Sequence, residues 1–181
     1  MSRFEQPILV TPQEYELEVK KILDASGVSL IEYDSSHLET VNGVDGEYII
    51  DVVARFTALD VKFVALVECK HHKRKVERKD VQVLHSKLQS VGAQKAILFS
   101  VSGFQDGALE YAKVHGIALA QFSNGSTSWF TRSIGPPLPP PQWGSIPQYV
   151  AWWHHGNSIS LLSEEHGEYT RQLLGLEPND P

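Results

Sequence analysis

Residues 46–79 read GEYIIDVVARFTALDVKFVALVECKHHKRKVERK, and this stretch decides the fold of the chain. It contains two apolar runs rich in Val, Ile and Phe, one from Tyr48 to Phe56 and one from Val61 to Cys69. A turn of residues 57–60 separates the two runs, and this spacing predicts the two strands of a β-hairpin.

Among the charged residues of these strands, three occupy positions that an ordinary core avoids: Asp51, Glu68 and Lys70. Side chains alternate across a strand, so Glu68 and Lys70 share one face while Val67 and Cys69 take the other. If the strands pair, Asp51 lies opposite the Glu68–Lys70 pair. Burying charges is costly unless they pair with one another or bind a metal, which indicates a functional site. The alternative is that the strand leaves the core here and its charges are solvated.

The composition indicates a folded domain with room for an appendage, since the chain has 181 residues. Hydrophobic residues make up 41% and charged residues 21%, which favours a packed core and argues against general disorder. The net charge is −6, so any nucleic-acid partner must be met by a local basic patch. A single cysteine, Cys69, excludes an internal disulfide and a multi-cysteine zinc site.

No signal-peptide pattern opens the chain, and no apolar run reaches the roughly 18 residues that suggest a membrane span. We therefore expect a soluble protein of the cytoplasm with no membrane partner.

Helical and strand patterns alternate outside the hairpin. Thr11, Pro12 and Glu14 form a capping box that predicts a helix to Ser26. Further patterns predict a short strand over 28–33, a polar turn region over 34–45, a helix over 80–91, a strand over 96–101, a helix over 104–115 that is capped by Ser102 and Gln105, and a strand over 117–122. The strand–helix–strand order over 96–122 implies a right-handed parallel crossover.

A concentrated basic segment follows the hairpin in this otherwise acidic chain. It consists of Lys73, Arg74, Lys75, Arg78 and Lys79, interrupted by one acid, Glu77. The segment predicts a contact with phosphates, and an exposed loop without a partner is the alternative.

The composition changes near residue 134, where prolines become frequent. This predicts a folded domain over 1–133 and a proline-rich extension over 134–181 that contains Trp143, Trp152 and Trp153. The apolar segment 161–176 is expected to form a short helix. The extension is expected either to strap across the domain or to form an oligomer contact, so a homodimer is one candidate assembly.

Four motifs follow one another in a familiar order: Tyr15-Glu16, Ile50-Asp51-Val52, Glu68-Cys69-Lys70 and Gln82, with an apolar strand and an Ala-rich helix over 96–120. The pattern, over about residues 12–122, resembles the PD-(D/E)xK nuclease superfamily and, within it, the Mrr-like restriction endonuclease group. This group often carries extra glycines and an acid before the aspartate. This chain reads Asp45-Gly46-Glu47-Tyr48 there, which leaves the subfamily open.

The resemblance implies an α/β restriction-endonuclease-like core of order α-β-β-β-α-β-α-β, with a mixed central sheet flanked by helices. It implies a metal-dependent deoxyribonuclease in which Asp51, Glu68 and the Cys69 backbone carbonyl hold Mg²⁺, with Mn²⁺ as a substitute. Lys70 would orient the attacking water or stabilise the transition state, while Glu16 and Gln82 would add polar groups. The partner would be DNA, and the role the restriction of foreign or modified DNA.

Two other functions remain open on the same residues. One is a catalytically silent nucleic-acid-binding module, and the other is a recombination-type nuclease that acts on branched DNA. A zinc site at His71-His72 or His154-His155 is disfavoured, because adjacent histidines on a strand point to opposite faces.

Overall fold

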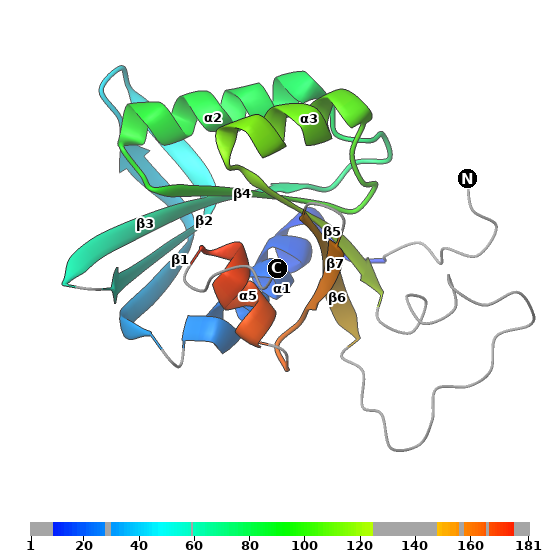
Figure 1. Cartoon of the computed structure of the whole chain (residues 1–181), viewed down its shortest axis with the longest axis horizontal. Coiled ribbons are helices and arrows are strands. Elements are labelled where there is room, and N and C mark those ends of the chain that lie inside the picture. Colours follow the sequence, from blue (N-terminus) through cyan, green and yellow to red (C-terminus); the bar gives the residue numbers. More distant parts are fainter. Residues whose placement is uncertain are drawn as a thin grey trace, which may run out of the picture.

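The computed structural model describes residues 9–27, 30–58, 60–124, 148–155, 158–165 and 167–175. They form a seven-stranded sheet of order β1-β2-β3-β4-β5-β6-β7 with helices on both faces (Figure 1). The elements are α1 (Pro12–Gly27), β1 (Ile31–Asn42), β2 (Glu47–Ala58), β3 (Val61–Lys70), α2 (Arg78–Val91), β4 (Lys95–Ser100), α3 (Asp106–His115), β5 (Ala118–Asn124), β6 (Tyr149–His155), β7 (Ser158–Leu162) and α5 (Gly167–Leu173).

The predicted hairpin is present. β2 and β3 pair antiparallel from Val52 opposite Val67 to Ala58 opposite Val61. β3, β4 and β5 are parallel, and α2 and α3 make the two connections, so the expected crossover is confirmed. β1 and β6 lie antiparallel to their neighbours, and the sheet is therefore mixed, as the fold class predicts.

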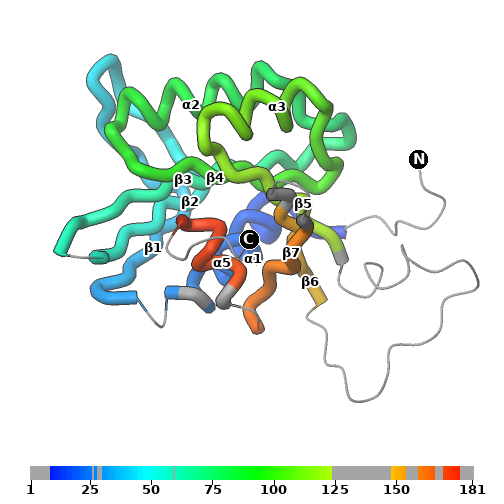
Figure 2. Tube along the Cα trace, in the orientation of Figure 1, coloured from blue at the N-terminus to red at the C-terminus, as the bar shows by residue number. Residues whose placement is uncertain are grey.

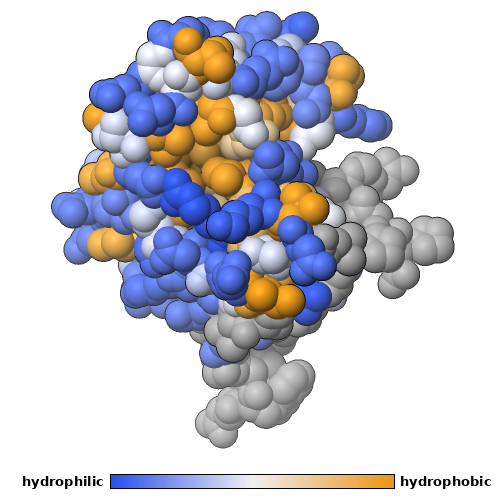
Figure 3. All heavy atoms as spheres, turned by 90° about the vertical axis from the view of Figure 1, so that its left-hand side faces the viewer, coloured by the Kyte–Doolittle hydropathy of each residue, from blue (hydrophilic) through white to orange (hydrophobic). Residues whose placement is uncertain are grey.

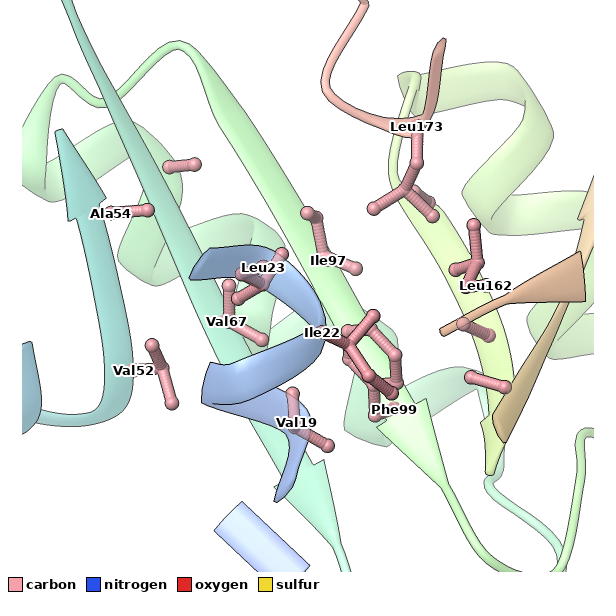
Figure 4. Packing of buried hydrophobic residues seen from close by; sticks show 14 of the residues in the cluster. Val19, Ile22, Leu23, Val52, Ala54, Val67, Ile97, Phe99, Leu162 and Leu173 are labelled. Carbon is pink, nitrogen blue, oxygen red and sulfur yellow. The ribbon is translucent and has the colours of Figure 1, made fainter. Parts of the chain in front are cut away.

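Each face of the sheet carries its own core. On one face, Val19, Ile22 and Leu23 of α1 pack over Val67 and Phe99 of the sheet, as Figure 4 shows. On the other face, α2 and α3 cover a second apolar cluster (Figure 1). Its members include Val53, Leu66, Val81, Leu84, Leu98 and Ala108. The central parts of the apolar runs, Val52–Ala54 and Ala65–Val67, are fully buried because helices cover both faces of the sheet.

The prediction for residues 28–45 is wrong in part. The polar stretch expected as a turn region belongs to β1, which continues to Asn42. β1 is an edge strand whose side chains alternate between partly buried and exposed positions, so it lacks the apolar pattern of a central strand. Only the end of the stretch turns, where the Gly43 N–H donates to the Gly46 carbonyl at 2.7 Å.

The start of α1 agrees with the sequence prediction, and the starts of α2 and α3 differ from it. Thr11 and Glu14 form the capping box of α1, with the Thr11 N–H 2.8 Å from Glu14 Oε2. α2 begins two residues earlier than expected, because Glu77 and Asp80 form a capping box of their own. The expected cap of α3 is wrong: α3 begins at Asp106, and the Ser102 hydroxyl donates instead to the Arg74 carbonyl.

The C-terminal segment adds to the same sheet and core. β6 pairs with β5, β7 pairs with β6, and Leu162 and Leu173 join the α1-side cluster. In Figure 2, α5 lies beside α1, which it contacts. The short helix expected within 161–176 corresponds to α5, whereas β6 and β7 were not predicted. The expected boundary at residue 133 lies outside the described residues.

Hydrophobic side chains also reach the surface, and Ile31, Ile49 and Val61 are each more than half exposed. The face drawn in Figure 3 is mostly hydrophilic, with hydrophobic atoms visible mainly in its upper half. In the described ranges, no helix is both long and apolar enough to cross a membrane.

Candidate active site

Asp51 lies at the point where β2 separates from β3. The paired register of these strands begins at Val52. Beyond it, the Cys69 N–H of β3 donates to the side chain of Asp51, at 2.7 Å from Oδ2, and not to the β2 backbone. Ile50 and Val52, two residues apart, would share a face in a regular strand, yet they belong to opposite cores. β2 therefore turns about its axis at Asp51, which brings this carboxylate to the end of β3.

A second irregularity lies across from Asp51 on β1. The β1–β2 register runs through His37 opposite Val52 and Glu39 opposite Ile50, and Leu38 between them has a φ of 53°. A bulky residue with positive φ is uncommon in a strand and marks a local bend. The bend of β1 at Leu38 therefore lies opposite the turn of β2 at Asp51.

Glu68 and Lys70 share one face of β3, as the alternation predicts, and their side chains form an ion pair of 3.2 Å. Glu68 is buried, with 8% of its side chain exposed, while Lys70 is 30% exposed. The sequence therefore brings a buried carboxylate and an accessible ammonium to the strand end next to Asp51.

The electrostatics of Asp51 indicate a shortage of positive charge around it. Burial, with a smaller contribution from the charges of Glu68 and Glu16, raises the pKa of Asp51 from 3.8 to about 6. The Cys69 N–H and, more weakly, Lys70 oppose this rise in pKa. Two carboxylates that raise the pKa of a third in a partly buried place form a setting that a cation would stabilise.

Glu16 of α1 reaches the site, and it has a partner that the sequence did not suggest. His37 Nε2 lies 2.7 Å from Glu16 Oε2, and both side chains are about 85% buried, with exposed fractions of 16% and 15%. His37 lies on the polar edge strand, whose position beside α1 was not predicted. No local signal in the sequence marks it.

Cys69 does not have the properties of a nucleophile. Its side chain packs against the α1-side core, and burial, followed by the charge of Asp51, raises the pKa of the thiol well above its usual value. A thiol of high pKa carries little thiolate at neutral pH. Cys69 therefore contributes its backbone, through the N–H that binds Asp51.

Tyr15, which precedes Glu16, is fully buried next to His71, with ring centroids 5.6 Å apart. Among the described residues, its hydroxyl has no hydrogen-bond partner. His71 and His72 have different surroundings, because His72 Nδ1 lies 2.8 Å from the Arg74 carbonyl. The two rings thus do not act as one chelating pair.

The helix α2 contributes Lys87, which sequence reasoning missed. Lys87 Nζ donates to Glu68 Oε1, and its side chain is 19% exposed. The expected residue of this helix, Gln82, has an exposed side chain. Lys87 had a signal, because it stands three residues after Leu84 and four before Val91, inside the apolar stripe of the helix.

The basic segment surrounds the start of α2, and its charges differ in availability. Arg74 and Lys79 are held by acids of the same segment, since Glu77 accepts from both at 2.9 Å. Arg78 lies over the Tyr111 ring at 5.2 Å. Lys73 and Lys75 are exposed.

The donor set fits a hard divalent cation with few protein ligands. In the described ranges, no group of three or more His, Cys, Asp and Glu side chains is arranged to hold a metal ion. Mg²⁺ does not need three such side chains, because it is usually bound through one or two carboxylates, retained waters and substrate phosphates. Asp51 and Glu68 satisfy that requirement, while the closed four-ligand site of a structural zinc is not offered by these residues.

Comparison with known proteins identifies the family. No curated protein matches the chain. A solved structure described as "Crystal Structure of Protein of Unknown Function AF1548" is similar, with 23% identity and a TM-score of 0.49 over 59% of this chain and 55% of that one. The chain thus spans about half the length of that protein. The model of the Mrr catalytic family, described as "Restriction endonuclease", matches residues 5–124. The chain therefore belongs to the Mrr-type restriction endonuclease family, within the PD-(D/E)xK nuclease superfamily, and carries a nuclease domain of that type.

Proposed function

We propose that this protein is an active, metal-dependent DNA endonuclease and that Asp51, Glu68 and Lys70 carry the reaction. The observation that supports this most strongly is the meeting of the three residues at the end of β3, where Asp51 binds the Cys69 N–H and Glu68 pairs with Lys70. The role that we propose is the restriction of foreign or modified DNA.

The cation in this proposal is Mg²⁺, with Mn²⁺ as a substitute, held by the carboxylates of Asp51 and Glu68 and by the Cys69 carbonyl. When bound, the ion would polarise a phosphoryl oxygen and lower the pKa of a water. The raised pKa of Asp51 supports this assignment, because a positive charge there would offset the burial of the carboxylate.

The protein groups around this point have separate tasks. Lys70 is exposed enough to meet a phosphate oxygen, and its ammonium would stabilise negative charge that develops in phosphodiester hydrolysis. Glu16, fixed by His37, would hold a proton or a water on the α1 side. Gln82 would make a polar contact with the substrate from α2. These tasks follow from chemistry and position.

DNA would lie along the basic segment. The exposed ammoniums of Lys73 and Lys75 would contact backbone phosphates, together with Arg74, Arg78 and Lys79 after these exchange their present partners. Such contacts position a duplex and do not read its sequence. The division into a nuclease domain over 1–133 and an extension over 134–181 stays a prediction, and the pairing of β6 with β5 favours an extension that folds together with the domain.

The experiment is a plasmid-nicking assay with Mg²⁺ on the wild type and on Asp51→Ala and Lys70→Ala. We expect relaxation of the plasmid by the wild type only, with EDTA as the metal-free control. DNA binding without cleavage by the wild type, in both Mg²⁺ and Mn²⁺, would contradict the proposal and support a silent binding module. Faster cutting of branched than of linear duplexes would instead support a recombination-type nuclease.

A further inference from the structure

Two lysine ammonium groups are paired with the carboxylate of Glu68. Lys87 Nζ donates to Oε1, and Lys70 Nζ lies 3.2 Å from Oε2, so both carboxylate oxygens face ammonium groups. Asp51, on the neighbouring strand, receives the Cys69 N–H. The Glu68 carboxylate is therefore paired with two charged groups, whereas the Asp51 carboxylate accepts a hydrogen bond from a neutral backbone N–H.

The geometry of α2 explains how a lysine comes to lie at this place. Lys87 follows Leu84 by one turn, and Leu84 is fully buried against the sheet, so the helix directs the Lys87 stem toward the sheet as well. The stem is mostly buried, with 19% of the side chain exposed, and only its ammonium meets a polar partner. A buried lysine needs such a partner, because an unpaired charge in this setting is costly.

The same contact conflicts with a metal on Glu68. A divalent ion at Oε1 would lie within a few ångströms of the Lys87 ammonium, and the two positive charges would repel each other. Lysine is a compact charge on a flexible four-carbon stem, so it can leave the carboxylate without movement of the helix.

We propose that Lys87 is a resident counter-ion of Glu68 that competes with the divalent cation for this carboxylate. This inference rests on the proposed metal site. In the free protein Lys87 neutralises Glu68, and binding of the cation releases the ammonium from Oε1. Lys87 is thus a positioning residue that sets how tightly the site binds metal before DNA arrives, and Lys70 stays on the substrate side.

Metal binding without DNA tests the proposal directly. Mn²⁺ is titrated into the wild type, Lys87→Met and Lys87→Gln, and free Mn²⁺ is measured by electron paramagnetic resonance. Lys21→Met is the matched control, because it removes the same charge from an exposed ion pair with Glu18 on α1. Asp51→Ala shows how much of the binding belongs to the proposed site.

We expect both Lys87 variants to bind Mn²⁺ about tenfold more tightly than the wild type, in the range of typical coupling between two sites. Lys21→Met should bind like the wild type. Because the coupling is reciprocal, a cation bound at Glu68 must also weaken the contact of Lys87 with this carboxylate. Mg²⁺ should therefore shift the Lys87 side-chain ammonium resonance of the wild type in an NMR titration. That measurement needs no variant and holds even if both substitutions prevent folding.

Two kinds of result would overturn the proposal, and they separate the counter-ion role from the metal site. If the wild type binds Mn²⁺ through Asp51 but folded Lys87 variants bind equally or more weakly, the counter-ion role is wrong and the metal site stands. An unchanged Lys87 resonance at saturating Mg²⁺ has the same meaning. If the wild type binds no Mn²⁺ at all, the metal site itself is wrong, and the counter-ion role is lost with it.

Discussion

The carboxylate of Asp51 accepts the backbone N–H of Cys69 at 2.7 Å, at the first position where β2 no longer pairs with β3. One side chain thus closes the hydrogen-bond ladder of the hairpin and lies at the candidate catalytic centre. The bond joins the stability of the hairpin to the protonation of Asp51.

The first prediction concerns the pH dependence of folding stability. The folded-state pKa of Asp51 is about 6, above the 3.8 of the free side chain, so between these values the folded protein keeps a proton that the unfolded chain has lost. Stability from this group is complete below about pH 4 and falls as the pH rises through about 6. After allowance for solvent screening, we expect a loss of about 1–2 kcal/mol.

Urea unfolding of the wild type and Asp51→Asn at several pH values measures this loss. Because Asn does not titrate, the variant should gain stability relative to the wild type between pH 4.5 and 7. Asp60→Asn, in the exposed β2–β3 turn, serves as the control. A difference between wild type and Asp51→Asn that stays constant with pH would contradict the assignment.

A second prediction concerns Lys70 as the group that meets the reacting phosphate. Lys70→Met should lower the rate of plasmid nicking by about 10²- to 10³-fold, because it removes one preorganised donor of positive charge. Binding of DNA in Ca²⁺, measured by fluorescence anisotropy, should change much less. Lys62→Met is the matched control, since Lys62 lies on the same strand and is exposed. Equal activity of the two variants would exclude Lys70 from the reaction.

The third prediction concerns the exposed ammoniums of the basic segment. Each of Lys73→Ala and Lys75→Ala should reduce the slope of log affinity against log salt by about 0.9 on duplex DNA, because each contact releases about one counterion. The loss should be similar for unrelated sequences. Lys113→Ala, exposed near the end of α3, should leave the slope unchanged. If all three variants behave alike, DNA does not follow this segment.

The sequence predicted the hairpin and its charges because that information is local. Alternation placed Glu68 and Lys70 together, and the two apolar runs brought Asp51 opposite them. His37 and the part of β1 beyond Tyr33 escaped prediction, since an edge strand in a polar stretch has no apolar periodicity and its partner α1 is distant in sequence. Lys87 was detectable as a lysine within the stripe of Leu84 and Val91, but its partner on β3 was not.

A fourth prediction tests whether the C-terminal segment folds with the nuclease domain. Leu173 of α5 is fully buried in the α1-side core, so Leu173→Ala should destabilise the protein by about 2–5 kcal/mol. Thermal unfolding should remain a single transition at a lower temperature. Ile159→Ala is the control, because Ile159 is 48% exposed on β7. Two separate transitions in the wild type would show that the segment is an independent unit.

The pairing of β6 with β5 has a practical consequence for fragments of this protein. A polypeptide that stops at residue 124, where the family match ends, would leave the outer backbone groups of β5 without their neighbour and would uncover Phe122 and Ala120. The unpaired N–H and C=O groups of an exposed edge strand can form hydrogen bonds with another chain. We therefore expect such a fragment to aggregate rather than to work as a minimal enzyme.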